Sequence, residues 1–212
     1  MTVLTDEDDD LAALPKLEIR GRDRVRELAE VFTHEREVNA MLDLVADSAA
    51  NIESRFLEPS CGNGNFLVAI LHRKLETVHR NFRQQKDFEF NSLKALASIY
   101  GVDIDSHNVK EARERMHAVM LDFYSNRMNT TRPTEGYLPA VDYILKKNII
   151  PGDMLNGVNK IKFTEFSSPK IYKFQQRVFK LADLMEDGLF GWMGPAPVQE
   201  IAMKHYWELA KK

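Results

Sequence analysis

The sequence predicts an α/β protein with a mostly parallel sheet and helices on both faces. Three short apolar runs end on carboxylates, at Glu58, Asp103 and Asp153. Segments with helical spacing of apolar residues separate these runs, and this alternation of strand and helix is typical of a parallel sheet. In such a sheet the three acids would lie at the same edge, where ligands bind.

The bulk composition is that of a globular protein. The chain has 212 residues, enough for one domain with a full core. Its formal net charge of -3 gives no overall attraction to nucleic acid, so any DNA contact would depend on a local basic face. No window reaches the roughly 20 apolar residues of a membrane span, and no signal peptide is recognisable at the start. We therefore expect a cytoplasmic protein with no membrane partner.

The chain divides into three predicted regions. Residues 1–16 contain five consecutive acidic residues, which repel one another, so we expect a flexible acidic tail. Residues 17–160 are predicted to form the main domain. Residues 161–212 are predicted to form a strand and helices that pack on this domain or contact a partner. Apolar spacing predicts a helix over 21–31 and another over 35–47.

Residues 56–66 read as a short strand, a tight turn and the start of a helix that runs to about Arg83. Gly62 and Gly64 accept positive φ and let the backbone approach a ligand. The following helix start offers unpaired N–H groups and a positive dipole end. Two glycines at this spacing also occur in ordinary turns, so the pattern alone is weak evidence for a ligand.

Two other features of this region have both a functional and an ordinary interpretation. The single cysteine, Cys61, excludes an internal disulfide and a cysteine-based zinc cluster. A nucleophilic thiol needs an electropositive setting, so we interpret Cys61 as a small residue tolerated beside a ligand. One face of the predicted helix carries basic residues such as Arg73 and Lys74, which could meet phosphates or simply be solvated.

The second strand is expected over 98–105 and the third over 148–150. Asp105 suits the N-cap of the next helix, which leaves Asp103 free for a ligand. An acid at the tip of the second strand commonly accepts hydrogen bonds from ribose hydroxyls. The third strand stops at residues 151–155, which contain Asp153.

The C-terminal region is predicted to be mainly helical. Residues 161–166 alternate as a strand. Ser168 and Pro169 form a good N-cap and first-turn pair, so we expect a helix up to about Met185, packed on the sheet or against a partner. A loop over 188–197, rich in glycine, proline and aromatics, would lead to a final helix.

Together these segments resemble the S-adenosylmethionine-dependent DNA methyltransferases that modify adenine at N6 in bacterial restriction-modification systems. The resemblance covers roughly residues 30–155. The stretch over 58–66, Glu-Pro-Ser-Cys-Gly-Asn-Gly-Asn-Phe, is similar to that family's turn of acid-Pro-x-x-Gly-x-Gly-x-Phe. The resemblance implies a Rossmann-like methyltransferase fold and S-adenosyl-L-methionine as the cofactor.

The resemblance also implies a role for each part of the site. The segment before the turn would hold the methionine end of the cofactor, and the turn would approach the methionine and the ribose. Asp103 would hold the ribose hydroxyls, Ile104 would pack on the adenine, and Asp153 would accept from the adenine amino group. The predicted cofactor site comprises Phe32, Thr33, Glu58, Pro59, Ser60, Gly62, Gly64, Phe66, Asp103, Ile104, Asp153 and Met154.

Charge distinguishes this cofactor from a dinucleotide. Glu58 at the turn would repel a pyrophosphate and suits the positively charged sulfonium and amino group. The spacing from the turn to Asp103 also exceeds the roughly 20 residues of the dinucleotide fingerprint. Both observations favour S-adenosylmethionine over NAD.

The catalytic tetrapeptide of the resembled family, Asn-Pro-Pro-Tyr or Asp-Pro-Pro-Tyr, does not occur in these 212 residues. Residues 161–169 stand where it is expected. Phe163 or Phe166 could stack on a base and Glu165 could accept a proton, but the alternation here favours a plain strand. We therefore assign no catalytic residue.

Three functions remain open from the sequence. The first is methyl transfer to adenine N6 in DNA, with DNA as the partner. The second is a non-catalytic or accessory cofactor-binding subunit that needs a separate specificity or restriction subunit. The third is a small-molecule methyltransferase, which would not bind duplex DNA.

Overall fold

A computed structural model describes residues 33–127, 132–186 and 195–211. Residues Glu35–Lys212 form one compact unit, and the segment that ends at His34 forms another. The predicted acidic tail and the helix predicted over 21–31 lie outside the described residues.

The described residues of the larger unit form two separate three-stranded sheets. The first is parallel and consists of β1 (Phe56–Glu58), β2 (Ile99–Asp103) and β3 (Ile149–Pro151), with β2 in the centre. The second is antiparallel and consists of β4 (Lys162–Lys170), β5 (Lys173–Lys180) and β6 (Gln199–His205), in chain order.

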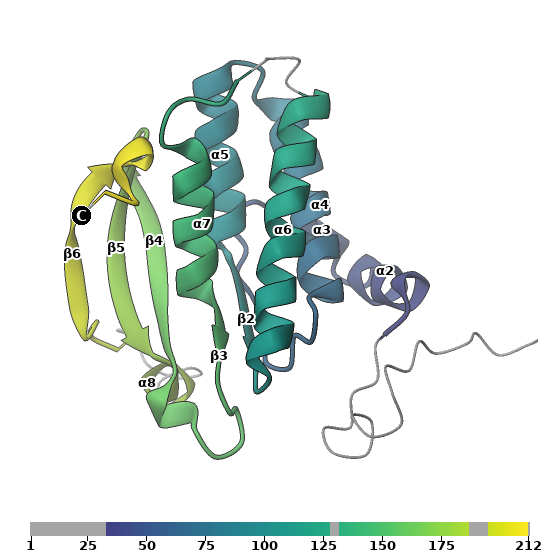
Figure 1. Cartoon of the computed structure of the whole chain (residues 1–212), viewed down its shortest axis with the longest axis vertical. Coiled ribbons are helices and arrows are strands. Elements are labelled where there is room, and N and C mark those ends of the chain that lie inside the picture. Colours follow the sequence, from purple (N-terminus) through teal and green to yellow (C-terminus); the bar gives the residue numbers. More distant parts are fainter. Residues whose placement is uncertain (1–32, 128–131, 187–194, 212) are drawn as a thin grey trace, which may run out of the picture. The chain divides into compact units, whose positions relative to one another are not determined.

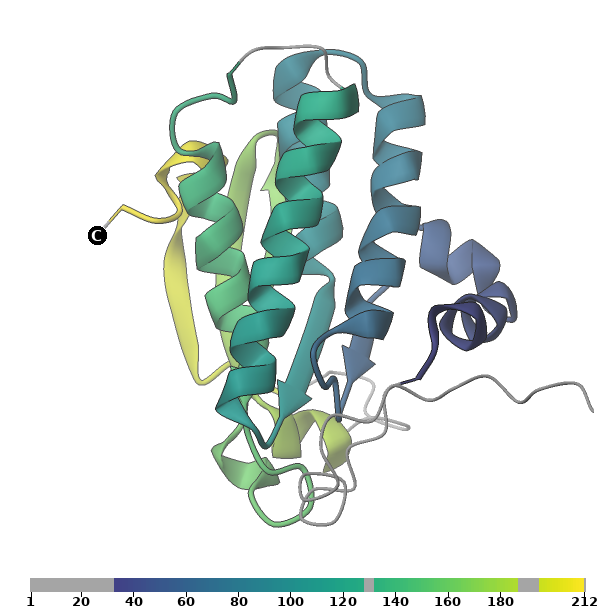
Figure 2. The same ribbon diagram turned by 45° about the vertical axis from the view of Figure 1, so that its right-hand side comes forward.

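Helices supply most of the core. They are α2 (Glu35–Asp43), α3 (Ala46–Ala50), α4 (Asn65–Asn81), α5 (Gln85–Ala97), α6 (Ser106–Arg127), α7 (Tyr137–Asn148) and α8 (Leu181–Glu186). Four of these described helices, α4 to α7, connect the parallel strands. Figures 1 and 2 show α4, α5, α6 and α7 side by side, and Figure 1 shows the antiparallel sheet next to α7. Single 3-10 turns, η1 (Val158–Lys160) and η2 (Tyr206–Glu208), precede β4 and follow β6.

The main apolar core lies among these four helices. Leu67, Leu71 and Leu75, spaced four residues apart, form a buried stripe along α4. Helix α5 is different because buried residues lie all around it. Helix α5 buries polar residues such as Glu89 and Ser92 together with apolar ones, so its sequence shows no apolar stripe, and it was not predicted.

The predicted Rossmann-like methyltransferase fold, with a mostly parallel sheet and helices on both faces, is wrong. Only half of the described strands are parallel, and the others form the separate antiparallel sheet. Helices α4 and α6 pack on one face of the parallel sheet, where a Cβ at Gly101 would lie 2.8 Å from Leu67 Cδ1. The opposite face, with Tyr100 and Val102, is covered instead by residues such as Ile161, Phe163 and Leu181 at the ends of the β4–β5 hairpin.

The C-terminal helix predicted from Ser168 to about Met185 is wrong except for its last part, which is α8, and the helix predicted from Val198 is also wrong, because β6 and η2 stand there. The strand predicted over 161–166 is confirmed as β4, but it continues through Pro169 and turns back as β5. The turn is Ile171 and Tyr172, and Tyr172 has φ 60°. The helix prediction failed because apolar residues of a hairpin fell by coincidence at three- and four-residue spacing.

Candidate functional site

Three loops meet at the carboxyl edge of the parallel sheet. They follow β1, β2 and β3, and hydrogen bonds join each to the next. Cys61 N–H donates to the Val102 carbonyl at 2.9 Å, and Gly152 N–H donates to the Asp103 carbonyl at 2.9 Å. The loops that carry Glu58, Asp103 and Asp153 are therefore one connected structure.

Asp103 is the centre of this structure. Its side chain is buried, with 7% exposure. Oδ2 accepts the Gly62 N–H at 2.8 Å, and Oδ1 accepts the Asp105 N–H at 2.9 Å and the Asn108 amide at 3.4 Å. Asp103 is thus not free, contrary to the expectation from the sequence. A carboxylate has about four acceptor positions, so capacity for one further donor remains.

Asp105 caps the next helix as predicted. Its Oδ1 accepts the His107 N–H at 2.8 Å, and its backbone carbonyl accepts the Val109 N–H at 3.2 Å. The two acids of this loop therefore have different duties: Asp103 holds the glycine turn, and Asp105 starts α6.

The glycine turn has the backbone conformation that its sequence predicts. Gly62 has φ 51° and Gly64 has φ 90°. A Cβ on Gly64 would lie 3.0 Å from Ala112 Cβ, so α6 packs directly against the turn. Arg115 of α6 donates to the Asn63 carbonyl at 2.8 Å, which holds the turn from outside.

Helix α4 begins at this turn without a side-chain cap. Its N-cap residue is Gly64, which has no side-chain acceptor for the N–H groups of the first turn. The positive end of the helix dipole therefore faces the loop. Phe66, in the first turn, packs partly against the core, so it fixes the start of the helix.

Glu58 places a partly buried carboxylate beside the turn. Burial raises its pKa, and a weak hydrogen bond from the Ser60 N–H, at 3.4 Å, opposes this shift. Pro59 and Ser60 are exposed. A desolvated carboxylate attracts a cation more strongly than a solvated one, because the local dielectric constant is lower.

The remaining predicted residues differ in how well they fit a binding role. Ile104 is 62% exposed at the loop tip, which suits an apolar contact with a ligand. Asp153 accepts the backbone N–H groups of Leu155 at 2.8 Å and Asn156 at 2.9 Å, and these bonds lower its pKa. Asp153 therefore shapes its own loop as an ionised acid. Met154 packs against the apolar cluster that includes Tyr100, Val102 and Ile161, on the face of the parallel sheet opposite α4 and α6.

The two predicted residues that precede the turn do not belong to the described part of the larger unit. Phe32 lies outside the described residues, and Thr33 belongs to the separate unit that ends at His34.

Cys61 is a packing residue. Its side chain is 6% exposed, and burial, with smaller contributions from Asp103 and Glu58, raises the pKa of the thiol to about 12. The thiol is thus protonated at neutral pH, which supports the interpretation of Cys61 as a small buried residue.

The basic face predicted for α4 is smaller than the sequence indicated. Lys74 is fully buried, and its ammonium donates to the carbonyls of Asn51 at 2.6 Å and Ser54 at 2.7 Å. Arg73 pairs with Asp43 at 2.7 Å. Neither side chain is available as a simple phosphate contact.

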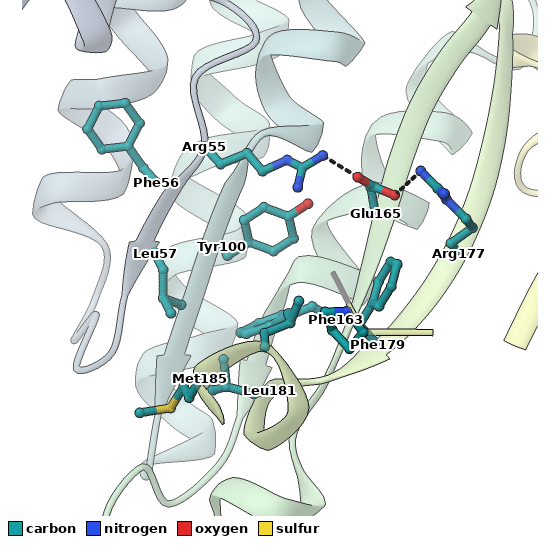
Figure 3. Close-up of a pocket in the computed structure, with 12 residues that line it drawn as sticks. Arg55, Phe56, Leu57, Tyr100, Phe163, Glu165, Arg177, Phe179, Leu181 and Met185 are labelled. Atoms are coloured by element: carbon teal, nitrogen blue, oxygen red, sulfur yellow. Dashed lines mark hydrogen bonds and ion pairs between the residues drawn. The ribbon is translucent and has the colours of Figure 1, made fainter. Parts of the chain in front are cut away.

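A second feature, not predicted from the sequence, is a cavity of about 530 Å³ beside β1 (Figure 3). Glu165 of β4 lies between two arginines there: it pairs with Arg177 at 2.6 Å and also with Arg55. The full lining is Arg55, Phe56, Leu57, Tyr100, Phe163, Glu165, Arg177, Phe179, Leu181, Leu184, Met185 and Pro195. These residues come together through packing between the two sheets, so no local pattern could have predicted them.

The residues considered as a replacement for the missing tetrapeptide already make contacts with other side chains of the protein. Phe163 packs edge-on against Tyr100 at 5.1 Å between ring centroids, and Phe166 packs against Tyr143 at 6.2 Å. Both Glu165 oxygens face arginines. Stacking on a base or accepting a substrate proton would require these contacts to break.

Comparison of the chain with models of known families, with curated proteins and with solved structures finds no match. None of the helices in the described part of the chain has the length and apolar character that a membrane crossing requires.

Proposed function

We propose that this protein binds S-adenosylmethionine at the carboxyl edge of its parallel sheet and takes part in methyl transfer to adenine N6 of DNA. The observation that carries the proposal is the bond from Gly62 N–H to the buried carboxylate of Asp103. It holds a positive-φ turn rigidly against the end of β2, next to the partly buried Glu58. A preformed backbone cradle flanked by acids suits a cationic nucleoside.

Each group of residues has a distinct part in this proposal. The uncapped start of α4 would receive the carboxylate of the methionine moiety, since helix N-termini bind anions. Glu58 would attract the amino group and the sulfonium. Asp103 would use its remaining acceptor capacity for a ribose hydroxyl, and Ile104 would cover the adenine.

When bound, S-adenosylmethionine supplies an activated methyl group, and the protein must position the acceptor and receive its proton. The engagement of Phe163, Phe166 and Glu165 favours the second form of the proposal, in which a partner subunit supplies base and target recognition. The small-molecule methyltransferase stays a third possibility because it needs the same cofactor site. In the first two forms the protein would share the cytoplasm with its DNA substrate.

Calorimetric titration with S-adenosylhomocysteine tests the cofactor site. We expect saturable binding that Ile104→Asp weakens about tenfold or more, because a charge replaces an exposed apolar contact. Gly62→Val should abolish it, since a branched side chain is strained at φ 51°. Glu114→Gln, an exposed position elsewhere on α6, is the matched control. Absence of binding by the intact protein would reject the proposal.

Incubation with labelled S-adenosylmethionine and unmethylated DNA, with and without the products of neighbouring genes, separates the three forms. Transfer by the isolated chain would reject the accessory form. Transfer only with a partner would reject the stand-alone enzyme. Cofactor binding without any DNA binding at low salt would favour a small-molecule acceptor.

A further inference from the structure

Strand β1 has an open edge. Its Phe56 N–H donates to the Ser98 carbonyl at 3.0 Å, toward β2. Because successive residues of a strand direct their backbone groups to opposite sides, the N–H and C=O of Leu57 point away from β2. In the part of the chain that the structure describes, no strand pairs with β1 on that side. The backbone N–H donor and C=O acceptor of Leu57 therefore face away from the sheet, as they would toward a further strand.

The cavity beside β1 adjoins this edge. The side chain of Leu57 is 43% exposed and lines the cavity, as do Phe163, Leu181 and Met185. Figure 3 shows these apolar side chains on both sides of the opening, and Met185 is itself 63% exposed. The edge thus combines unpaired backbone groups with an apolar space into which neighbouring side chains would fit.

The charged end of the cavity has an excess of positive charge. Arg55 and Arg177 share the single carboxylate of Glu165, which is the only acid among the described lining residues. Arg55 directs its guanidinium across the opening to Glu165 (Figure 3) instead of along β1, so it does not block the edge as edge-strand charges commonly do. An acidic group would complement this end.

We propose that the open edge of β1 accepts an extended segment of another protein, which places an apolar side chain in the cavity and an acidic side chain beside Arg55 and Arg177. A strand is the ligand that satisfies a backbone N–H and C=O together, and strand addition at a sheet edge is a recurrent mode of peptide recognition. The inference depends on the geometry of β1 and does not require cofactor binding.

Charge argues against the β1 of a second copy, and so against a symmetric β1–β1 dimer, as the occupant. Arg55 and Leu57 direct their side chains to one face of the sheet, and Glu58 directs its side chain to the other. A second β1 would therefore bring another arginine to the cavity face and no acid. A different protein, with an acid at the matching position, fits better.

A labelled synthetic peptide tests the proposal by fluorescence anisotropy. The probe is acetyl-Thr-Val-Thr-Val-Asp-Val-Thr-Val-Thr-amide, a generic strand, because backbone hydrogen bonds supply most of the affinity in strand addition. Leu57→Pro removes the outward N–H without touching the ladder to β2, so we expect it to weaken binding about tenfold. Leu57→Val retains the N–H and is the matched control. The intact protein should prefer this peptide to the same peptide with Asn in place of Asp, and Arg177→Gln should remove that preference.

A version of the peptide with alternate backbone nitrogens methylated keeps the test decisive if Leu57→Pro fails to fold. The intact protein should bind the unmodified peptide and not the methylated one. Absence of saturable binding, or equal binding of both peptides, overturns the proposal. A dimer, detected by light scattering, that Leu57→Pro separates also overturns it, because a second copy would then occupy the edge. Peptide binding that appears only after residues 188–193 are replaced by glycine and serine overturns it too, because this chain would then occupy its own edge. S-Adenosylhomocysteine titration of Leu57→Pro, expected to be unchanged, keeps this outcome separate from the proposed function.

Discussion

At the scale of single residues, Lys74 is the most unusual side chain in the described structure. Its ammonium has no exposed surface, donates to two backbone carbonyls of the loop before β1, and lies 5.2 Å from the centre of the Phe56 ring. Burial lowers its pKa from 10.5 to about 8. Lys74 thus fixes the approach to β1 at a cost in desolvation of its charge.

The pH dependence of stability should reveal this cost. Below pH 8 Lys74 is charged in both states, and above pH 10.5 it is neutral in both. Between these values the unfolded chain binds the additional proton, so the destabilising contribution of Lys74 is present at the lower pH and disappears as pH rises. Cys61 acts in the opposite sense above pH 9.0, because its folded pKa is raised to about 12.

The unfolding free energy of the intact protein and of Lys74→Met, measured in urea from about pH 7 to about pH 10, separates these contributions. Cys61 is present in both proteins, so the difference between the two curves reports Lys74. We expect the stability of the intact protein relative to Lys74→Met to increase with pH. Parallel curves would show that Lys74 has an ordinary pKa in the folded state.

At the scale of elements, local patterns predicted those structures whose residues are close in sequence. The turn over 58–66, the start of α6 at Asp105 and the strand β4 are all local and were predicted. The bond between Gly62 and Asp103 joins residues 41 positions apart, so no local pattern could show that Asp103 is engaged. Helix α5 buries polar and apolar residues alike and so shows no apolar stripe, and the β4–β5 turn uses Tyr172, not the glycine or asparagine that usually marks positive φ.

Glu165 joins the two sheets, so its removal should weaken the contact between the parallel sheet and the antiparallel sheet. The carboxylate is 12% exposed and pairs with Arg177 of β5 and with Arg55, which precedes β1. Glu165→Gln leaves two guanidinium groups without a counter-charge, but both are partly exposed, and solvent screens their repulsion. We expect a loss of about 1 kcal/mol in unfolding free energy, larger at low salt.

A double-mutant cycle with Arg55→Met measures this contact by urea unfolding at low and high salt. A positive coupling energy that falls with salt supports the ion pair as a link between the sheets. Simple additivity at both salt concentrations would mean that Arg55 and Glu165 are placed by packing alone. Lys110→Met with Glu114→Gln, an exposed pair on α6, provides the matched control cycle.

At the scale of the whole unit, the buried carboxylate of Glu89 ties the helices to the C-terminal turn. Its Oε1 accepts the Thr134 N–H at 2.8 Å and the Tyr124 hydroxyl at 3.1 Å, and its Oε2 accepts the Tyr206 hydroxyl at 2.6 Å. These donors come from the segment before α7, from α6 and from η2. One acid in α5 therefore holds together three segments that lie far apart in the chain.

Tyr206→Phe should weaken this connection without disrupting the packing of the ring. The variant removes one donor to a buried charge, so we expect a loss of about 1.5–3 kcal/mol in unfolding free energy. Because Tyr206 lies in the last described turn and Glu89 lies in the helical core, the loss should appear equally in far-ultraviolet circular dichroism and in tryptophan fluorescence. A fluorescence transition that precedes the loss of helix would instead mean that β6 and η2 separate from the helices before the core unfolds.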